Sequence, residues 1–420
     1  MKVIADLQIH SRYSRACSQD LTPGNIGKWA DKKGIGVIGT GDFTHPAWLR
    51  ELKEALSEAR PGLYQLKDAS AKAYFLLSAE ISSIYKQGDK VRRVHNMVLA
   101  PNFDAVDKII AGLENIGCNL KSDGRPITGV KCPDLVKIVL EADPRCVIIP
   151  AHAWTPHFGV FGSLSGFDSI KEAFGDQSKH IFAIETGLSS DPAMNWQISD
   201  LDKYALLSNS DAHSLRKLGR EANVFEIKDS SLSYEEIIRI IKNKDPKEFL
   251  YTIEFFPEEG KYHLDGHADC KFSCTPEQTE KYAGICPNCG KRLLVGVLNR
   301  VAALADRPHG FKPDNAVPFK NVIPLEEVIA ETFDTGISKK VLEMYERMTA
   351  QTPEFAILLD LSREEIEKIS NSYIAESVMR VREGKVNIAG GYDGVFGVIR
   401  IYADKERAKM EKKAVQSSLF

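Results

Sequence analysis

Eight short apolar runs in the first half of the chain each lead to a side chain that can bind a metal ion or lie beside one. Runs of this kind, separated by helical patterns, are typical of buried parallel strands with helices outside. The ends of such strands meet at one rim, so residues far apart in sequence come together there. We therefore predict a metal cluster at this rim. The runs are VIADL before Gln8 and His10, IGVIG before Asp42, YFLLS before Glu80, VHNMVLA around His95, CVIIP before His152, IFAI before Glu185, YALLSNS before Asp211 and His213, and NVFEI with its Glu226.

The composition is that of a globular protein with several domains. The chain has 420 residues, of which 43% are hydrophobic and 27% charged, and its formal net charge is −3. This charge does not indicate a nucleic-acid binder as a whole, so contact with a polyanion would need local basic patches. We find no apolar stretch of the roughly 18 residues that span a membrane and no signal-peptide core, so we expect a cytoplasmic protein without a membrane partner.

The order of patterns along the chain predicts four segments. Residues 1–230 alternate strands with helices such as 46–59 and 103–116, and seven or eight such units favour a barrel. Residues 250–295 are rich in turn residues and cysteines, and a small fold of this kind needs disulfides or a bound metal ion for stability. Residues 296–402 are mainly helical and 403–420 form a charged tail. The helices predicted after residue 230 are 235–243, 293–305, 324–333, 337–350 and 362–384.

The strand-end residues mix imidazole and carboxylate groups. This mixture suits zinc, manganese or iron better than calcium or magnesium alone. Each residue taken singly has a structural alternative, because Asp42 could cap a helix and Glu80 or Glu185 could pair with an arginine. Their joint position at strand ends favours the metal interpretation.

Residues 1 to about 230 resemble the PHP (polymerase and histidinol phosphatase) family of metallophosphoesterases. Its D-L-H-x-H motif appears as DLQIH at 6–10, its T-D-H motif as TGD at 40–42, and its S-D-x-H motif as SDAH at 210–213. The resemblance implies a distorted (β/α) barrel with up to three metal ions. Gln8 and Asp42 replace histidine ligands, so the site holds fewer ions here or uses more oxygen ligands.

The same resemblance implies the roles of individual residues. Paired ions about 3.5–4 Å apart lower the pKa of a water molecule and neutralise phosphoester oxygens, which leads to hydrolysis. The expected ions are zinc, manganese or magnesium. The implied metal ligands are Gln8, His10, Asp42, Glu80, His95, His152, Asp211 and His213, of which His10, Asp42, Glu80, Asp211 and His213 are also implied to be catalytic. We also predict that Arg216 and Arg220 clamp DNA phosphates, although solvated surface arginines are an equal alternative.

Four cysteines in the second segment predict a structural zinc site. Cys270 and Cys274 form one close pair, and Cys286 and Cys289 form the other. Two close pairs with a short spacer are typical of a tetrahedral zinc site, against the alternatives of free thiols or a disulfide. The nearby His263 and His267 are expected to be bystanders. Such modules often brace nucleic-acid surfaces and are not needed to enclose a small substrate.

A glycine-rich segment at 385–397 contains two aromatic residues, Tyr392 and Phe396. Glycines allow close backbone approach to a ligand, and the aromatic rings are suited to stack on a base or to enter a duplex. The alternative is a turn between a helix and a strand. We predict that Tyr392 and Phe396 contact DNA.

The order of these modules over nearly all 420 residues resembles the endonuclease Q family. This resemblance implies a DNA repair endonuclease that uses metal-activated water to nick 5′ to uracil, hypoxanthine, xanthine and abasic sites, with damaged DNA as partner. The end of the chain, Gln416–Phe420, resembles the start of a sliding-clamp peptide, and the alternative is a chance match of a short motif. The alternatives are a small-molecule phosphatase of the histidinol-phosphate type and a non-catalytic DNA-binding module. The sequence lacks the phosphate loop of a helicase.

Overall fold

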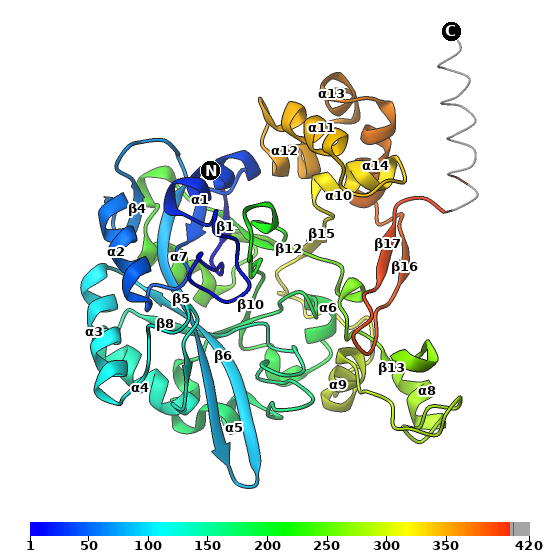
Figure 1. Cartoon of the computed structure of the whole chain (residues 1–420), viewed down its shortest axis with the longest axis horizontal. Coiled ribbons are helices and arrows are strands. Elements are labelled where there is room, and N and C mark those ends of the chain that lie inside the picture. The colour runs from blue at the N-terminus through cyan, green and yellow to red at the C-terminus, as the bar shows by residue number, and fades with distance from the viewer. Residues whose placement is uncertain (404–405, 407–420) are drawn as a thin grey trace.

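The N-terminal half is built on one large sheet, which Figure 1 shows surrounded by helices. The computed structural model describes residues 1–403 and residue 406 of the chain. Alternate side chains of the first strand enter different cores, because Val3 and Ala5 pack on one face and Ile4 on the other. The strands of the sheet are β1 (Lys2–Asp6), β2 (Val37–Gly39), β3 (Leu56–Arg60), β4 (Leu63–Leu66), β5 (Tyr74–Gln87), β6 (Lys90–Ala100), β7 (Ile127–Thr128), β8 (Val147–Pro150), β11 (Ala222–Glu226), β12 (Phe249–Glu254) and β15 (Phe319–Asn321).

The strand pairing is mixed, whereas the sequence predicted a parallel sheet or barrel. The order is β15-β12-β11-β1-β2-β5-β4-β3, with β6 and β7 paired to β5 and β8 paired to β6. Strand β1 pairs parallel with β2 but antiparallel with β11. Only Gly88 and Asp89 separate β5 from β6, and so short a turn requires antiparallel pairing. Strands β9 (Ala183–Glu185) and β10 (Ala205–Leu207) form a separate parallel pair. All eight predicted strands are confirmed, and the mixed α/β class is confirmed with them.

Helices cover this sheet, and three of the seven lie where the sequence predicted them, at 46–59, 103–116 and 235–243. The prediction for 46–59 was too long, because residues from Leu56 onward are extended and pair with β4 as strand β3. Helix α7 begins at its cap Ser233 and buries Ile237, Ile240 and Ile241 beneath the sheet. The helices are α1 (Pro23–Lys33), α2 (Pro46–Ala55), α3 (Phe103–Asn115), α4 (Cys132–Ala142), α5 (Ile170–Phe174), α6 (Pro192–Asn195) and α7 (Tyr234–Asn243).

The C-terminal helices form a compact cluster with its own core. This core contains Leu325, Tyr345, Ile366 and Ile374, and Figure 1 shows the cluster beside helix α1. The predicted helix 362–384 is divided in two, because Asn371 caps a new helix through hydrogen bonds to two backbone amides. The cluster consists of α10 (Leu325–Thr332), α11 (Lys339–Thr349), α12 (Glu354–Leu359), α13 (Arg363–Ile369) and α14 (Ser372–Arg382).

A small module is inserted in the sequence between strands β12 and β15 of the main sheet. These strands pair in parallel, so the sheet continues beyond the predicted domain end at residue 230. The module contains β13 (Asp265–His267), β14 (Phe272–Cys274), α8 (Pro276–Lys281) and α9 (Val297–Leu304). Helix α9 packs on the N-terminal half, because Val301 joins its core and Arg300 donates to the carbonyl groups of Phe161 and Phe167. The hairpin of β16 (Asn387–Ala389) and β17 (Val398–Arg400) runs from the helical cluster toward the module (Figure 1).

Two further predictions concern membrane-spanning helices and the C-terminal tail. Within the described residues, every helix is too short or too polar to cross a membrane. The predicted sliding-clamp peptide, Gln416–Phe420, lies outside the described residues, as does most of the charged tail.

Candidate functional site

Six of the predicted metal ligands form two groups at one rim of the sheet. Within each group, one nitrogen or oxygen atom of every residue lies within 4.8 Å of the others. The first group consists of His10, which follows β1, and Asp211 and His213, which follow β10. The second group consists of Glu80 from β5, His95 from β6 and His152, which follows β8. Strand ends remote in sequence therefore meet as the sequence analysis predicted.

The carboxylate of Glu80 lies between the two groups. Its Oε2 atom is 3.0 Å from Nε2 of His10, and its Oε1 atom contacts His95 and lies 3.3 Å from Nε2 of His152. His10 Nε2 is also 3.0 Å from Oδ1 of Asp211. This is the arrangement expected of a carboxylate that can face two cations at once.

The donor atoms of both groups have the properties of metal ligands. Nε2 of His10, Oε2 of Glu80 and Oδ1 of Asp211 are buried and have no hydrogen-bond partner in the described chain, despite their close approach. A buried polar atom without a partner is costly, so native structures retain such atoms chiefly where something binds them. The mixed imidazole and carboxylate set fits divalent ions such as zinc or manganese.

Burial and close charges shift the pKa values of these groups strongly. Burial alone would lower the pKa of His10, but the carboxylates of Asp42, Asp211 and Glu80 outweigh it and raise that pKa well above its ordinary value. Burial would raise the pKa of Glu80, but His95 and Arg125 bring it well below the usual range. The rim is therefore a concentration of ionised carboxylates with a strong attraction for cations.

Three of the predicted site residues have left-handed backbone conformations. The φ angles are 49° at Asp42, 29° at His152 and 47° at Asp211. Such conformations are uncommon outside glycine and cluster at functional sites. Gly187 permits the bend at His152, because a Cβ atom at this glycine would lie 2.5 Å from Cβ of His152.

Asp42 lies behind His10 and outside both donor groups, although the sequence predicted it to be a ligand. Its Oδ1 atom is 3.0 Å from Nδ1 of His10, and its Oδ2 atom accepts hydrogen bonds from Ser11 and Ser14. Both oxygens are thus occupied. Asp42 is therefore placed to orient His10, as carboxylates beside metal-bound histidines commonly are.

Gln8, which the sequence also predicted to be a ligand, faces Glu185. With its amide nitrogen toward Glu185, it donates to both carboxylate oxygens at 3.1 and 2.9 Å. Glu185 in turn accepts a hydrogen bond of 2.6 Å from the backbone amide of His152. Burial raises the pKa of Glu185 to about 8. Gln8 and Glu185 therefore support the bend that presents His152.

The donor groups open into a cleft of about 370 Å³. Arg125, which the sequence analysis missed, lies here with its Nη1 atom 3.5 Å from Oε2 of Glu80. It lies in the irregular segment between α3 and β7, where no strand pattern indicated a site residue. The other lining residues are Ser82, His95, Ile127, His152, Thr155, Phe158, Gly187, Leu188, Ser189, Asp211 and His213.

The two arginines predicted to bind DNA each contact another part of the protein. Nε of Arg216 lies 2.7 Å from Oε2 of Glu326 in helix α10. Nε of Arg220 donates at 2.8 Å to the carbonyl of Ser210, beside the ligand Asp211. Each Nε atom therefore has a partner within the protein, and contact of the two guanidinium groups with DNA phosphates stays a prediction.

The cysteine module presents a third donor group, with one ligand exchanged relative to the prediction. His267, Cys270, Cys286 and Cys289 lie within 4.8 Å of one another. Cys274 lies outside this group in the described chain, because its buried thiol faces Thr279 Oγ1 at 3.2 Å. His267, expected to be a bystander, takes its place.

The two aromatic residues of the glycine-rich segment differ in exposure. Phe396 is 64% exposed, and Nζ of Lys261 lies 4.5 Å from its ring centre. Tyr392 instead packs against the module, since a Cβ atom at Gly266 would lie 2.4 Å from the Tyr392 ring. Only Phe396 of the pair is thus openly presented to solvent.

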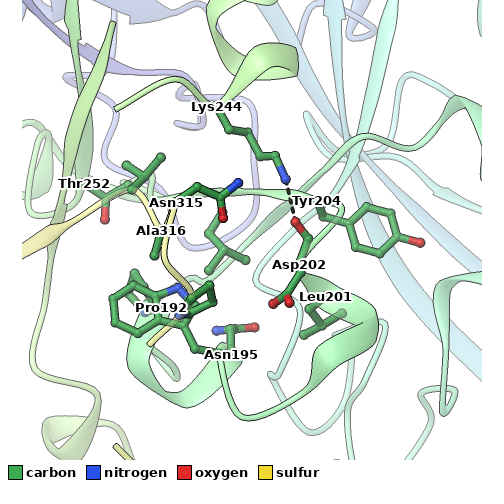
Figure 2. Close-up of a pocket in the computed structure, with 13 residues that line it drawn as sticks. Pro192, Asn195, Leu201, Asp202, Tyr204, Lys244, Thr252, Asn315 and Ala316 are labelled. Carbon is green, nitrogen blue, oxygen red and sulfur yellow. Dashed lines mark hydrogen bonds between the residues drawn. The ribbon is translucent and has the colours of Figure 1, made fainter. Parts of the chain in front are cut away.

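A second, smaller cavity of about 50 Å³ lies apart from the donor groups. Figure 2 shows Lys244 and Asn315 at this cavity, with Nζ of Lys244 donating to the Asp202 carbonyl at 2.6 Å. Asn195 also lines it and accepts a hydrogen bond of 2.8 Å from the buried Trp154. None of the residues that line this cavity belongs to a donor group of the described chain, so we assign it to packing.

Comparison with known proteins places this geometry in context. Residues 324–385 match the model described as the MJ0043 C-terminal domain. The uncharacterized protein YqxK of Bacillus subtilis is 30% identical over 380 residues, which cover 88% of this chain and 90% of the relative. The uncharacterized protein MJ0043 of Methanocaldococcus jannaschii is 32% identical over 264 residues, 60% of this chain and 32% of the relative.

Solved structures agree over the whole length. The lesion-specific endonuclease PfuEndoQ of Pyrococcus furiosus is 32% identical, with a TM-score of 0.85 and 98% of each chain covered. Endonuclease Q in complex with a 27-mer duplex that carries an abasic lesion at the active site is also 32% identical, with a TM-score of 0.83 over 96% of this chain and 98% of that one. Sequence and fold agree from end to end, and the chain belongs to the endonuclease Q family.

Proposed function

We propose that the protein is a DNA repair endonuclease that hydrolyses the phosphodiester bond 5′ to uracil, hypoxanthine, xanthine and abasic sites. The observation that carries the proposal is the pair of donor groups beside one open cleft, in which Nε2 of His10, Oε2 of Glu80 and Oδ1 of Asp211 are buried without a hydrogen-bond partner in the described chain. The relatives of known activity, similar over the full length, are a lesion-specific endonuclease and an endonuclease bound to an abasic duplex.

In this proposal the residues of the rim bind two metal ions and the scissile phosphate. His10, Asp211 and His213 hold one divalent ion of zinc, manganese or magnesium, and Glu80, His95 and His152 hold a second. When bound, such ions lower the pKa of a water molecule and neutralise phosphate oxygens. Arg125 lies in the same cleft, where its planar guanidinium can bind two oxygens of the scissile phosphate.

The surface beyond the cleft contributes DNA contacts. Phe396 and Lys261 combine an exposed aromatic ring with a cation, which suits stacking on a base and contact with a phosphate. Tyr392 anchors the segment on the module and does so through packing. The group of His267, Cys270, Cys286 and Cys289 holds a structural zinc ion that keeps this module folded.

A nicking assay with end-labelled duplexes tests the proposal. Duplexes with a central uracil, hypoxanthine or abasic site should be cut on the 5′ side of the lesion, and the undamaged duplex should stay intact. Release of phosphate from histidinol phosphate without nicking would instead indicate a small-molecule phosphatase. Lesion-independent DNA binding without nicking, and zinc in the cysteine module alone, would indicate a non-catalytic DNA-binding protein.

A further inference from the structure

We infer that the C-terminal helices position the loop that carries Asp211 and His213, with Glu326 as the positioning residue acting through Arg216. This loop, residues 210–221, is called the ligand loop below. It connects β10 to β11 and contains two of the three residues of the first donor group. The inference rests on the proposed function, because it concerns the same rim.

The first half of the ligand loop is fixed to the segment after β1 that carries His10. The backbone amide of Asp211 donates to the carbonyl of Gln8, and that of His10 donates to the carbonyl of Ala212, both at 3.0 Å. The buried carboxylate of Asp6 accepts from the backbone of Ser210 at 3.0 Å and from that of Gly219 at 2.9 Å. These bonds join the two ends of the loop, and Leu218 between them is buried in the core of the N-terminal half.

The middle of the loop is held by the helical cluster. Arg216 pairs with Glu326 at 2.7 Å, and Nζ of Lys217 pairs with Glu327 at 2.6 Å. Phe355 of α12 packs on the loop backbone, since a Cβ atom at Gly219 would lie 3.1 Å from its ring. Two helices of one cluster thus contact a segment that begins three residues after His213.

Burial makes the Glu326 contact the strongest of these restraints. Its side chain is 2% exposed, whereas that of Glu327 is 21% exposed. A charge pair with one buried partner is weakly screened by water and fixes geometry more firmly than an exposed pair. The start of α10 is itself fixed, because Glu354 accepts a hydrogen bond of 2.9 Å from the Leu325 amide and forms a buried ion pair of 2.6 Å with Lys33.

The experiment compares the full-length protein with Glu326→Gln and with Glu346→Gln as matched control. Glu346 pairs with Lys32 across the same interface but is 57% exposed and lies away from the ligand loop. Nicking of an abasic duplex is measured against Mn²⁺ concentration, together with kcat, KM and Tm. For Glu326→Gln we expect the half-activating Mn²⁺ concentration to rise ~10-fold and kcat to fall, as for other residues that orient metal ligands. KM for DNA should stay at the wild-type value in Glu326→Gln. The control variant should match the wild-type protein in every one of these measurements.

An unchanged Mn²⁺ requirement in Glu326→Gln, even with a lower Tm, would overturn the inference and leave a purely structural ion pair. If Glu326→Gln does not fold, Arg216→Gln takes its place, because it removes the same ion pair from its more exposed side, and there too an unchanged Mn²⁺ requirement would overturn the inference. If the wild-type protein does not nick any duplex, the proposed function fails by itself. Calorimetric Mn²⁺ titration of the same variants then tests the positioning role separately.

Discussion

Oδ1 of Asp42 lies 3.0 Å from Nδ1 of His10, on the side of the ring away from Nε2, which faces Glu80 and Asp211. A hydrogen bond at Nδ1 fixes the proton there and leaves the Nε2 lone pair directed at the rim. Asp42, which the sequence analysis predicted to be a metal ligand, is therefore placed to orient His10.

The first prediction follows from this contact. Asp42→Asn should weaken metal binding and nicking by about 10–100-fold, because the amide no longer enforces one tautomer of His10. Activity titrated with Mn²⁺ measures the effect, and Asp20→Asn, at an exposed position, is the control. A variant with wild-type Mn²⁺ dependence would refute the orienting role.

The second prediction concerns a residue of the first donor group. Asp211→Asn should lower kcat by about 10³-fold, since loss of several kcal/mol of charge stabilisation corresponds to such a factor. Its Tm should remain near the wild-type value, because Oδ1 of Asp211 makes no hydrogen bond in the described chain. The exposed Asp200→Asn is the control. Full activity of Asp211→Asn would remove this residue from the metal site.

The third prediction separates the ligands of the cysteine module. Cys286→Ser and His267→Ala should each release zinc and lower Tm, because a module of this kind depends on its metal for folding. Cys274→Ser should retain zinc, since Cys274 lies outside the donor group. Metal content is read by elemental analysis. Zinc loss in Cys274→Ser with retention in His267→Ala would restore the ligand set predicted from the sequence.

The fourth prediction concerns Arg125. Arg125→Gln should lower kcat/KM by about 10–100-fold, the equivalent of one lost charged hydrogen bond to phosphate. Arg125→Lys should recover part of this loss, because lysine keeps the charge but cannot bind the phosphate in the bidentate geometry of a guanidinium group. Metal content should not change. Arg145→Gln, which removes an arginine that is 48% exposed, serves as control.

The fifth prediction concerns pH and stability. Burial raises the pKa of Glu254 from 4.5 to about 8, and burial together with Glu254 raises that of Glu221 well above its usual value. The folded state thus favours the protonated acids, so their contribution is complete below pH 4.5 and is lost as the pH rises toward 8. Glu254→Gln should therefore reduce the fall in the free energy of unfolding between pH 5 and 8. An equal fall in both proteins would contradict the assignment.

The sequence predicted the strands and the donor residues well because both depend on local pattern. Apolar runs of four to seven residues mark buried strands, and most of the polar side chains beside these runs come together at one rim. Glu226 does not, because β11 runs antiparallel to β1 and places it at the opposite end of that strand, where it contacts the N-terminal amine at 2.7 Å. The pairing itself was not predicted, because a turn as short as Gly88–Asp89 imposes antiparallel neighbours that the apolar pattern does not encode.

Roles that depend on tertiary contacts were not visible in the sequence. Arg216 looked like a phosphate ligand, and only the fold reveals Glu326 beside it. Spacing favoured Cys274 over His267, but the backbone turns that thiol toward Thr279. Arg125 follows no periodic segment, so its position beside Glu80 had no signal in the chain.

The parallel pairing of β12 with β15 has a consequence for the module between them. The polypeptide leaves the sheet edge after residue 254 and rejoins it at residue 319, so residues 255–318 are tethered at both ends to adjacent strands. One break of the chain within this insertion would leave each fragment joined to the sheet. The insertion is therefore the place for the new termini of a circularly permuted protein, because the pairing of β12 with β15 keeps these two strands in register.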